Sequence, residues 1–255
     1  MLDLHNIYKT FNAGTVNEKT ALNGLNLHLN EGDFVTVIGG NGAGKSTMLN
    51  MIAGVYPIDS GKIEIDGVNI SREPEYKRAK YIGRVFQDPM RGTAANMEIQ
   101  ENLAMALRRG KSRGLGWGIK KNEKDFYREA LAQLDLGLQT RMTSKVGLLS
   151  GGQRQALTLL MATLQKPKLL LLTARKVLDL TEKIVDEQNL TALMVTHNMK
   201  DAIQIGNRLI MMHEGRIIYD VAGEEKKNLQ VEDLLERFEK VSGEEFANDR
   251  MMLAK

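Results

Sequence analysis

The chain has 255 residues and a hydrophobic content of 42%, enough to bury a substantial core in one large domain or two small ones. The 35 basic and 32 acidic residues leave a net charge of +3, with no long basic arm or acidic tail, so nucleic acid is not the expected partner. The absence of cysteine excludes disulfides and thiolate metal sites, and no apolar run approaches the roughly 18 residues of a membrane span. With no apolar signal core at its start, the sequence predicts a protein that stays in the cytoplasm and neither crosses the membrane nor is exported.

The first third of the sequence has the pattern of antiparallel strands around one buried strand. Apolar and polar residues alternate over residues 25–29 and again on both sides of the turn-forming pair Asp66-Gly67. Between these segments "FVTVIGG" is a continuous apolar run, typical of a strand covered on both faces. The following "STMLNMIAG" predicts a helix that ends at Gly54.

The rest of the sequence alternates between strand and helix patterns. Strands are predicted in "KLLLL", "TALMVTH", "RLIMM" and "RIIYD", with helices in "TARKVLDLTEKIVDEQ" and "MKDAIQIG". This alternation predicts an α/β fold with a parallel sheet. Residues 95–166 read as mostly helical and form an inserted lobe, whereas residues 1–94 and 167–220 form the core and residues 221–255 a helical tail.

The segment "GGNGAGKST" directly follows the buried strand and matches the phosphate-binding pattern G-x-x-x-x-G-K-[ST]. Its glycines let backbone N–H groups cradle phosphate oxygens, and the start of the next helix adds its positive dipole end. Lys45 is predicted to meet the β and γ phosphates of ATP, and Ser46 to ligate Mg²⁺. The alternative is a glycine-rich turn that only connects strand to helix. The expected nucleotide-binding residues are Gly39, Asn41, Gly42, Ala43, Gly44, Lys45, Ser46 and Thr47.

A second glycine motif, "LLSGGQRQALTLL", has an ordinary and a functional interpretation. Ser150 and Gln153 form a capping box for a helix with an apolar stripe. Gly151 and Gly152 also leave backbone donors uncovered at the positive helix end, which favours a second anion site.

Together, "GGNGAGKST" and "LSGGQ" resemble the nucleotide-binding subunits of ATP-binding cassette (ABC) transporters, over nearly the whole chain. The resemblance implies a P-loop NTPase core with an N-terminal antiparallel β subdomain and an inserted helical lobe. It also implies a head-to-tail homodimer in which the signature helix of one chain, at residues Ser150 to Gln153, faces the γ-phosphate held by the other. Separate membrane permease subunits would place the protein on the cytoplasmic face of a bacterial membrane.

The resemblance assigns roles to three further residues. Gln87 in "VFQDP" matches a glutamine that senses Mg²⁺, His197 matches the switch histidine near the γ-phosphate, and Phe11 matches the aromatic that stacks on adenine. The alternatives are an ordinary amide at a strand end, a histidine after a buried strand and a core aromatic, with Tyr8 as a rival to Phe11.

The sequence departs from the family where its acidic residues should stand. The family has an aspartate and a catalytic glutamate after the strand that follows the signature helix, whereas "TARK" follows Leu172 here. Asp179, Glu182 and Asp186 read as the solvated face of the next helix and not as replacements. The strand runs into the helix pattern without the usual loop, and the spacing from Leu172 to His197 is roughly ten residues shorter than the family implies. We favour a longer natural chain with an acidic loop that this sequence omits; the alternative is a true deletion.

The expected function is ATP hydrolysis that drives solute transport through ATP-dependent dimer closure. A true deletion would leave a non-hydrolysing, ATP-gated interaction module, and a third alternative is a non-transport relative such as a metallocluster-assembly ATPase. The tail ending in "DRMML" resembles a bacterial importer subgroup found beside substrate-binding lipoproteins, which implies import of an amino-acid-like solute. The basic stretch at residues 108–125, with Trp117, is either a solvated loop or a contact to the membrane subunit or anionic lipid.

Overall fold

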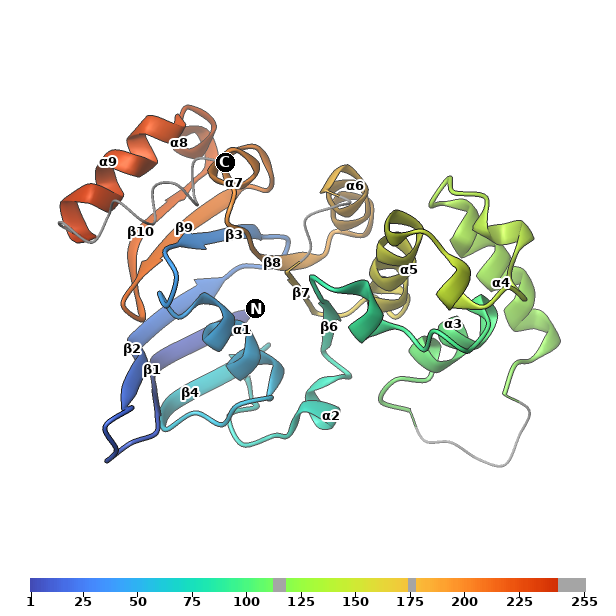
Figure 1. Cartoon of the computed structure of the whole chain (residues 1–255), viewed down its shortest axis with the longest axis horizontal. Coiled ribbons are helices and arrows are strands. Elements are labelled where there is room, and N and C mark those ends of the chain that lie inside the picture. The colour runs from blue at the N-terminus through green and yellow to red at the C-terminus, as the bar shows by residue number, and fades with distance from the viewer. Residues whose placement is uncertain (112–117, 174–177, 243–255) are drawn as a thin grey trace.

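The computed structural model describes residues 1–111, 118–173 and 178–242, and these residues build two sheets (Figure 1). The smaller sheet is antiparallel with strand order β2-β1-β4-β5. The pair Asp66-Gly67 forms the predicted hairpin turn between β4 and β5, and both residues have positive φ, +49° and +74°. The strand bounds are β1 Leu2–Phe11, β2 Lys19–Leu29, β4 Ser60–Ile65 and β5 Val68–Asn69.

The larger sheet has strand order β10-β9-β3-β8-β7-β6 and is parallel except for β10. Every residue of β3 is buried, which confirms the strand predicted to be covered on both faces. The final strand departs from the parallel pattern because only Glu214 and Gly215 separate β9 from β10, and so short a connection can join antiparallel strands alone. The bounds are β3 Phe34–Gly39, β6 Ile82–Val85, β7 Leu169–Leu172, β8 Thr191–Val195, β9 Arg208–His213 and β10 Arg216–Ala222.

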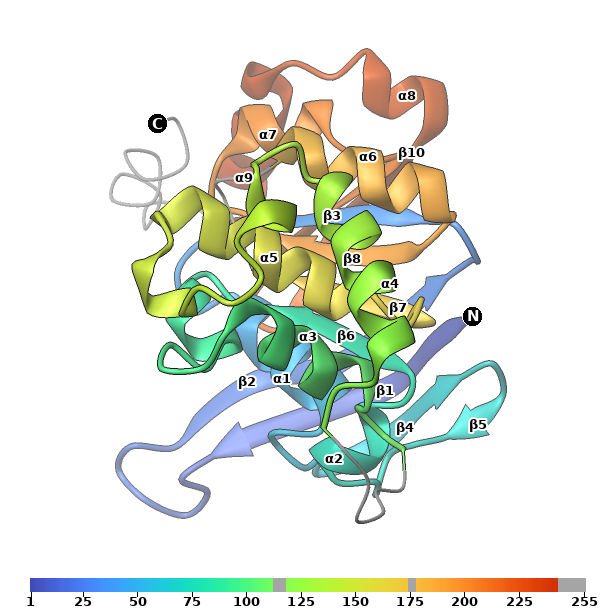
Figure 2. The ribbon, with the colours of Figure 1, turned by 90° about the vertical axis from the view of Figure 1, so that its right-hand side faces the viewer.

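Helices cover the larger sheet, and α3, α4 and α5 gather at one end of the molecule, away from β1 and β2 (Figure 1); this end faces the viewer in Figure 2. They share an apolar cluster with side chains of β6, β7 and β8. In the described ranges, no helix combines the length and apolar composition that a membrane span requires. The helix bounds are α1 Lys45–Ala53, α2 Glu75–Arg78, α3 Ile99–Leu107, α4 Lys121–Ala132, α5 Gly151–Thr163, α6 Leu178–Gln188, α7 Met199–Gln204, α8 Gly223–Lys227 and α9 Val231–Ser242, with 3-10 turns η1 Pro89–Gly92, η2 Leu138–Thr140 and η3 Val146–Leu148.

Helix α1 packs against both sheets, and this fixes the loop that precedes it. Its buried residues Met48 and Ile52 belong to one apolar cluster with Leu4 of the smaller sheet and Val37 of the larger one. Gly54 ends the helix in the left-handed conformation, at φ +84°, as predicted. Because the helix is held on two sides, its first turn and the glycine loop are presented at a fixed position.

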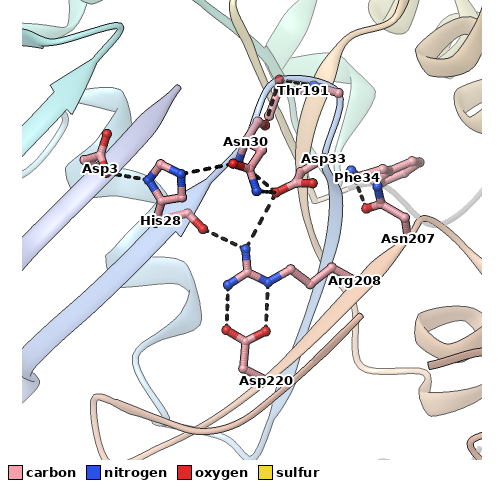
Figure 3. A network of polar contacts seen from close by, with 10 residues as sticks. Asp3, His28, Asn30, Asp33, Phe34, Thr191, Asn207, Arg208 and Asp220 are labelled. Atoms are coloured by element: carbon pink, nitrogen blue, oxygen red, sulfur yellow. Dashed lines mark hydrogen bonds and ion pairs between the residues drawn. The ribbon is translucent and has the colours of Figure 1, made fainter. Parts of the chain in front are cut away.

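A network of polar contacts joins the smaller sheet to β9 and β10 (Figure 3). The guanidinium of Arg208 donates two hydrogen bonds to the carboxylate of Asp220, at 2.8 and 2.6 Å, and a third to the carbonyl of His28, at 2.7 Å. The ring of His28 lies 2.5 Å from Asp3, and this hydrogen bond lowers the pKa of the Asp3 carboxyl. Side chains from β1, β2, β9 and β10 are therefore joined at one place.

The basic stretch at residues 108–125 is not one solvated loop. Its end, from Lys121, is part of α4, and Arg108 donates to both carboxylate oxygens of Glu123 at 2.9 and 2.8 Å. Arg109 donates to the carbonyl of Ala162 on α5. Two basic residues of this stretch therefore bind within the helical region. The predicted contact through Trp117 lies outside the described residues.

Candidate functional site

The loop between β3 and α1 has a shape that requires glycine at two of its predicted positions. Gly39 has φ +147°, and a Cβ there would come within 2.2 Å of the carbonyl oxygen of Met212. Gly44 has φ +98°, and a Cβ there would come within 2.5 Å of the carbonyl oxygen of Ala21. Both contacts are with backbone, which cannot move aside easily, so any larger residue would displace the loop.

Lys45 is the first residue of α1, and its side chain turns back into the loop. It is only 5% exposed, and its Nζ donates hydrogen bonds to the carbonyls of Gly39 and Gly40, each at 2.7 Å. A buried ammonium of this kind is costly to desolvate unless it is hydrogen-bonded. The carbonyl contacts therefore hold a positive charge under the glycine loop, where an anion can approach the backbone N–H groups.

A cavity of about 270 Å³ lies over this loop and brings together residues far apart in the sequence. Its lining includes Phe11 from the end of β1 and His197 from the loop after β8. Tyr8, the rival aromatic, is not among the lining residues. The ring of Phe11 packs edge-on against Tyr56, with ring centroids 5.3 Å apart. The lining also includes every expected phosphate-loop residue from Asn41 to Thr47.

A second cavity of about 790 Å³ adjoins the first, and Ser46 lines both. Gln87, in the loop after β6, lines the second cavity together with Thr173, which follows the last residue of β7. Ser46 and Gln87 therefore line one cavity, although they are far apart in the sequence.

The end of β7 presents a hydroxyl where the family pattern has a carboxylate. Thr173 donates through Oγ1 to the carbonyl of Val85 at 3.1 Å. The two carboxylates that do line the second cavity each have a partner: Glu75 lies 3.8 Å from Arg84, and Asp88 accepts from the backbone N–H of Met90 at 2.9 Å.

The predicted solvated face of α6 supplies no replacement for this carboxylate. None of its acidic residues, Asp179, Glu182 and Asp186, lines either cavity. The first described residue of α6 is Leu178, and the predicted junction of strand and helix at residues 174–177 lies outside the described residues.

The second glycine motif begins α5 as a capping box. The Ser150 hydroxyl accepts from the backbone N–H of Gln153, and the Gln153 side chain accepts from the backbone N–H of Ser150, both at 3.2 Å. A Cβ on Gly151 or Gly152 would meet nothing within 4 Å, so the face of this helix start is open. Residues 150–153 line neither cavity, and within one chain they are not part of the site over the loop.

Lys19 is a residue of the first cavity that sequence reasoning missed. It pairs with Phe11 across β1 and β2. These two residues flank the connection between the strands, so the sequence already makes them neighbours, but it does not show that this end of the sheet lies against the glycine loop. The tertiary structure alone brings Lys19 to the loop.

Comparison with known proteins identifies the family. The profile of the family described as ABC transporter matches residues 22–173. A tyrosine transport ATP-binding protein from Clostridioides difficile (strain R20291) is 43% identical over 249 residues, which covers 94% of this chain and 99% of that protein. The spermidine/putrescine import ATP-binding protein PotA of Haemophilus influenzae (strain ATCC 51907 / DSM 11121 / KW20 / Rd) is 33% identical over 86% of this chain, but over only 57% of its own length.

Solved structures agree with this relationship. A dimeric ATP-binding cassette in a post-hydrolysis state, bound to ADP and Pi, is 27% identical with a TM-score of 0.71, over 87% of this chain and 98% of that one. A nucleotide-free cassette from an ABC transporter, also 27% identical, has a TM-score of 0.72 over 89% of this chain and 93% of that one.

The family match ends at the point where this sequence departs from the family pattern. The family match ends at residue 173, directly after β7. The alignment with the Clostridioides protein extends over 249 positions, whereas 94% of 255 residues is about 240, so roughly nine positions of that relative have no counterpart here. Glycine loop, signature helix, sheet order and overall similarity nonetheless agree: the chain belongs to the ABC transporter family and is an ATP-binding ATPase subunit of such a transporter.

Proposed function

We propose that this chain binds Mg-ATP over its glycine loop and drives solute import by closing head to tail with a second copy. The observation that carries the proposal is the cavity over the loop, where Phe11, Lys45 and His197 meet. Two ATP molecules would be enclosed between the two chains, and hydrolysis and product release would reopen them.

Each lining residue has a chemical task in this proposal. The ring of Phe11 stacks on adenine, and residues 39–47 hold the phosphates through backbone N–H groups and the Lys45 ammonium. His197 contacts the γ-phosphate. The site is completed by Ser150, Gly151, Gly152 and Gln153 of the partner copy. This assignment is supported by the open face at the two glycines and by the absence of these residues from the lining of either cavity of their own chain.

The residues at the junction of the two cavities fit Mg²⁺ in part. The Ser46 hydroxyl and the Gln87 amide could each supply an oxygen ligand, since both residues line the second cavity, and Mg²⁺ usually completes its shell with phosphate oxygens and water. The carboxylate that ordinarily supports such a site does not follow β7, where Thr173 stands. Bound Mg²⁺ would offset the negative charge of the phosphates, and Ser46 and Gln87 would orient it.

The proposed assembly includes separate membrane permease subunits and a substrate-binding lipoprotein, with this chain on the cytoplasmic face of a bacterial membrane. Import of an amino-acid-like solute is supported by the tyrosine transport relative, which the chain matches over nearly its full length. Within the chain we assign residues 1–94 and 167–220 to the nucleotide-binding core, 95–166 to the helical lobe and 221–255 to the tail.

A Lys45→Ala variant tests the phosphate site. We expect tight Mg-ATP binding to be lost, because the positive charge under the loop is removed. The measurement is calorimetric titration with Mg-ATP, together with thermal unfolding, since the buried Lys45 also serves two carbonyls. ATP affinity that is unchanged in a folded variant would contradict the assigned site.

The missing carboxylate favours a second candidate: a subunit that closes on ATP but turns it over very slowly. Without a positioned general base, the rate is expected to fall about 10²- to 10⁴-fold. The test is phosphate release by protein whose mass is confirmed as 28.5 kDa. Trapped ATP with negligible release favours this candidate, whereas brisk turnover at that mass excludes it.

A variant that restores the acidic pair sharpens the comparison. Thr173→Asp combined with Ala174→Glu places the two carboxyl groups directly after β7. If the missing base limits turnover, this variant should release phosphate faster than the parent. A single Thr173→Ser change is the matched control, because it keeps the hydroxyl that donates to Val85 and should not alter the rate.

A further inference from the structure

We infer that Lys19 is a second phosphate-binding lysine of the nucleotide site, reaching it from strand β2 of the antiparallel sheet, whereas Lys45 reaches it from α1. This inference rests on the proposed nucleotide site and adds a residue to it. Lys19 is the first residue of β2, and it lines the same cavity as Lys45 and the glycine loop.

The Lys19 ammonium lies close to the middle of the glycine loop. A Cβ built on Gly42, in the middle of the loop, would lie 3.1 Å from Nζ of Lys19. The two lysines therefore approach the loop from different directions: Lys45 binds the carbonyls of Gly39 and Gly40 from within the loop, and Lys19 lies against Gly42 from β2. Gly42 has φ +80°, and its lack of a side chain keeps this approach open.

The ammonium of Lys19 is available for a ligand. In the described part of the chain it makes no hydrogen bond or ion pair, whereas Lys9, on the neighbouring strand, is bound to Asp59 at 2.6 Å. Lys19 is also exposed, so it has not lost its hydration to burial. A hydrated, unpaired ammonium beside an anion site can bind a phosphate oxygen without first breaking another contact.

The charges of the cavity indicate what Lys19 would bind. The described lining includes Lys19, Lys45 and His197 and no carboxylate. A cavity with an excess of positive charge favours a polyphosphate, and two lysines on different elements can contact different oxygens of the same chain. Lys19 lies opposite Phe11 in the β1–β2 pair, so its cation is next to the ring proposed to stack on adenine. Its Nζ lies towards Gly42, where the phosphates are expected to bind.

The test measures binding of ATP, ADP and adenosine to Lys19→Ala, Lys19→Glu and Lys19→Arg variants by calorimetric titration. We expect Lys19→Ala to weaken ATP binding roughly fivefold to tenfold and Lys19→Glu to weaken it further, because one charge-assisted hydrogen bond is lost. Lys19→Arg should retain affinity within about twofold, and ATP binding by Lys19→Ala should depend less steeply on salt concentration. Lys62→Ala is the matched control, since Lys62 is an exposed lysine of the same sheet that binds Glu64.

The outcomes separate this inference from the proposed function. Loss of ATP binding in Lys45→Ala, with unchanged ATP affinity in Lys19→Ala and Lys19→Glu, would overturn the role of Lys19 and leave the site intact. Equal losses for ATP and adenosine in Lys19→Ala would also overturn it, because the lysine would then act on the base. Unchanged affinity in Lys45→Ala would instead overturn the nucleotide site itself.

Discussion

At the residue scale, Lys226 shows how burial alters the charge of one side chain. It is 1% exposed, and its Nζ donates to the carbonyls of Ile205 and Gly206. Desolvation by burial lowers the pKa of this amine from 10.5 to about 8. The folded state therefore releases the proton more readily than the unfolded state, so stability is reduced below pH 8 and recovers as the pH rises from 8 towards 10.5.

We expect the free energy of unfolding to rise by about 2–3 kcal/mol across this pH range, relative to a Lys226→Met variant that cannot titrate. Urea unfolding of both proteins at pH 7.5, 9 and 10.5 measures the difference. Parallel pH profiles of the two proteins would show that Lys226 has the same pKa in both states.

At the scale of elements, Arg208 connects strands of the two sheets. Its side chain is 17% exposed and binds Asp220, the carbonyl of His28 and, at 3.6 Å, Asp33 (Figure 3). Arg208→Leu leaves these acceptors without their donor, so we expect a loss of roughly 1–3 kcal/mol in the free energy of unfolding. Denaturant unfolding gives the value.

A surface arginine provides the comparison for this change. Arg128 binds Asp125 at 2.7 Å on α4, but its side chain is 53% exposed, and exposed pairs contribute little to stability. Arg128→Leu should therefore change the free energy of unfolding by less than about 0.5 kcal/mol. Equal losses in the two variants would mean that the network between the sheets adds nothing beyond an ordinary surface pair.

At the scale of the whole molecule, the open start of α5 is expected to meet a second copy of the chain. Ser150→Arg places a bulky side chain where the partner's γ-phosphate would lie, so it should prevent ATP-dependent dimerisation while a single chain still binds ATP. Sedimentation with and without ATP measures this. Ser150→Thr, which keeps a capping hydroxyl, should dimerise normally. If Ser150→Arg still dimerises with ATP, the start of α5 is not part of the dimer interface.

Local pattern was enough to predict much of the molecule. Four features followed from short stretches of sequence: the buried strand β3, the Asp66-Gly67 turn, the end of α1 at Gly54 and the capping box at Ser150. Each depends on a few neighbouring residues, namely an apolar run, a turn-forming pair, a glycine or a capping side chain. The family resemblance, based on two short motifs, added the choice of fold, which the matches confirm.

Tertiary structure decided what depends on chain segments meeting. Lys19 meets Gly42 of the glycine loop only in the folded chain, and the selection of Phe11 over Tyr8 follows from which of the two lines the cavity. The hydrogen bond from Arg109 to the carbonyl of Ala162 joins residues 53 positions apart in the sequence. Sequence by itself predicted the phosphate-binding loop at residues 39–47, because that chemistry belongs to residue types at fixed spacing in one short segment. Which distant side chains share the cavity was decided by packing, because strand register and helix contacts are cooperative properties of the folded chain.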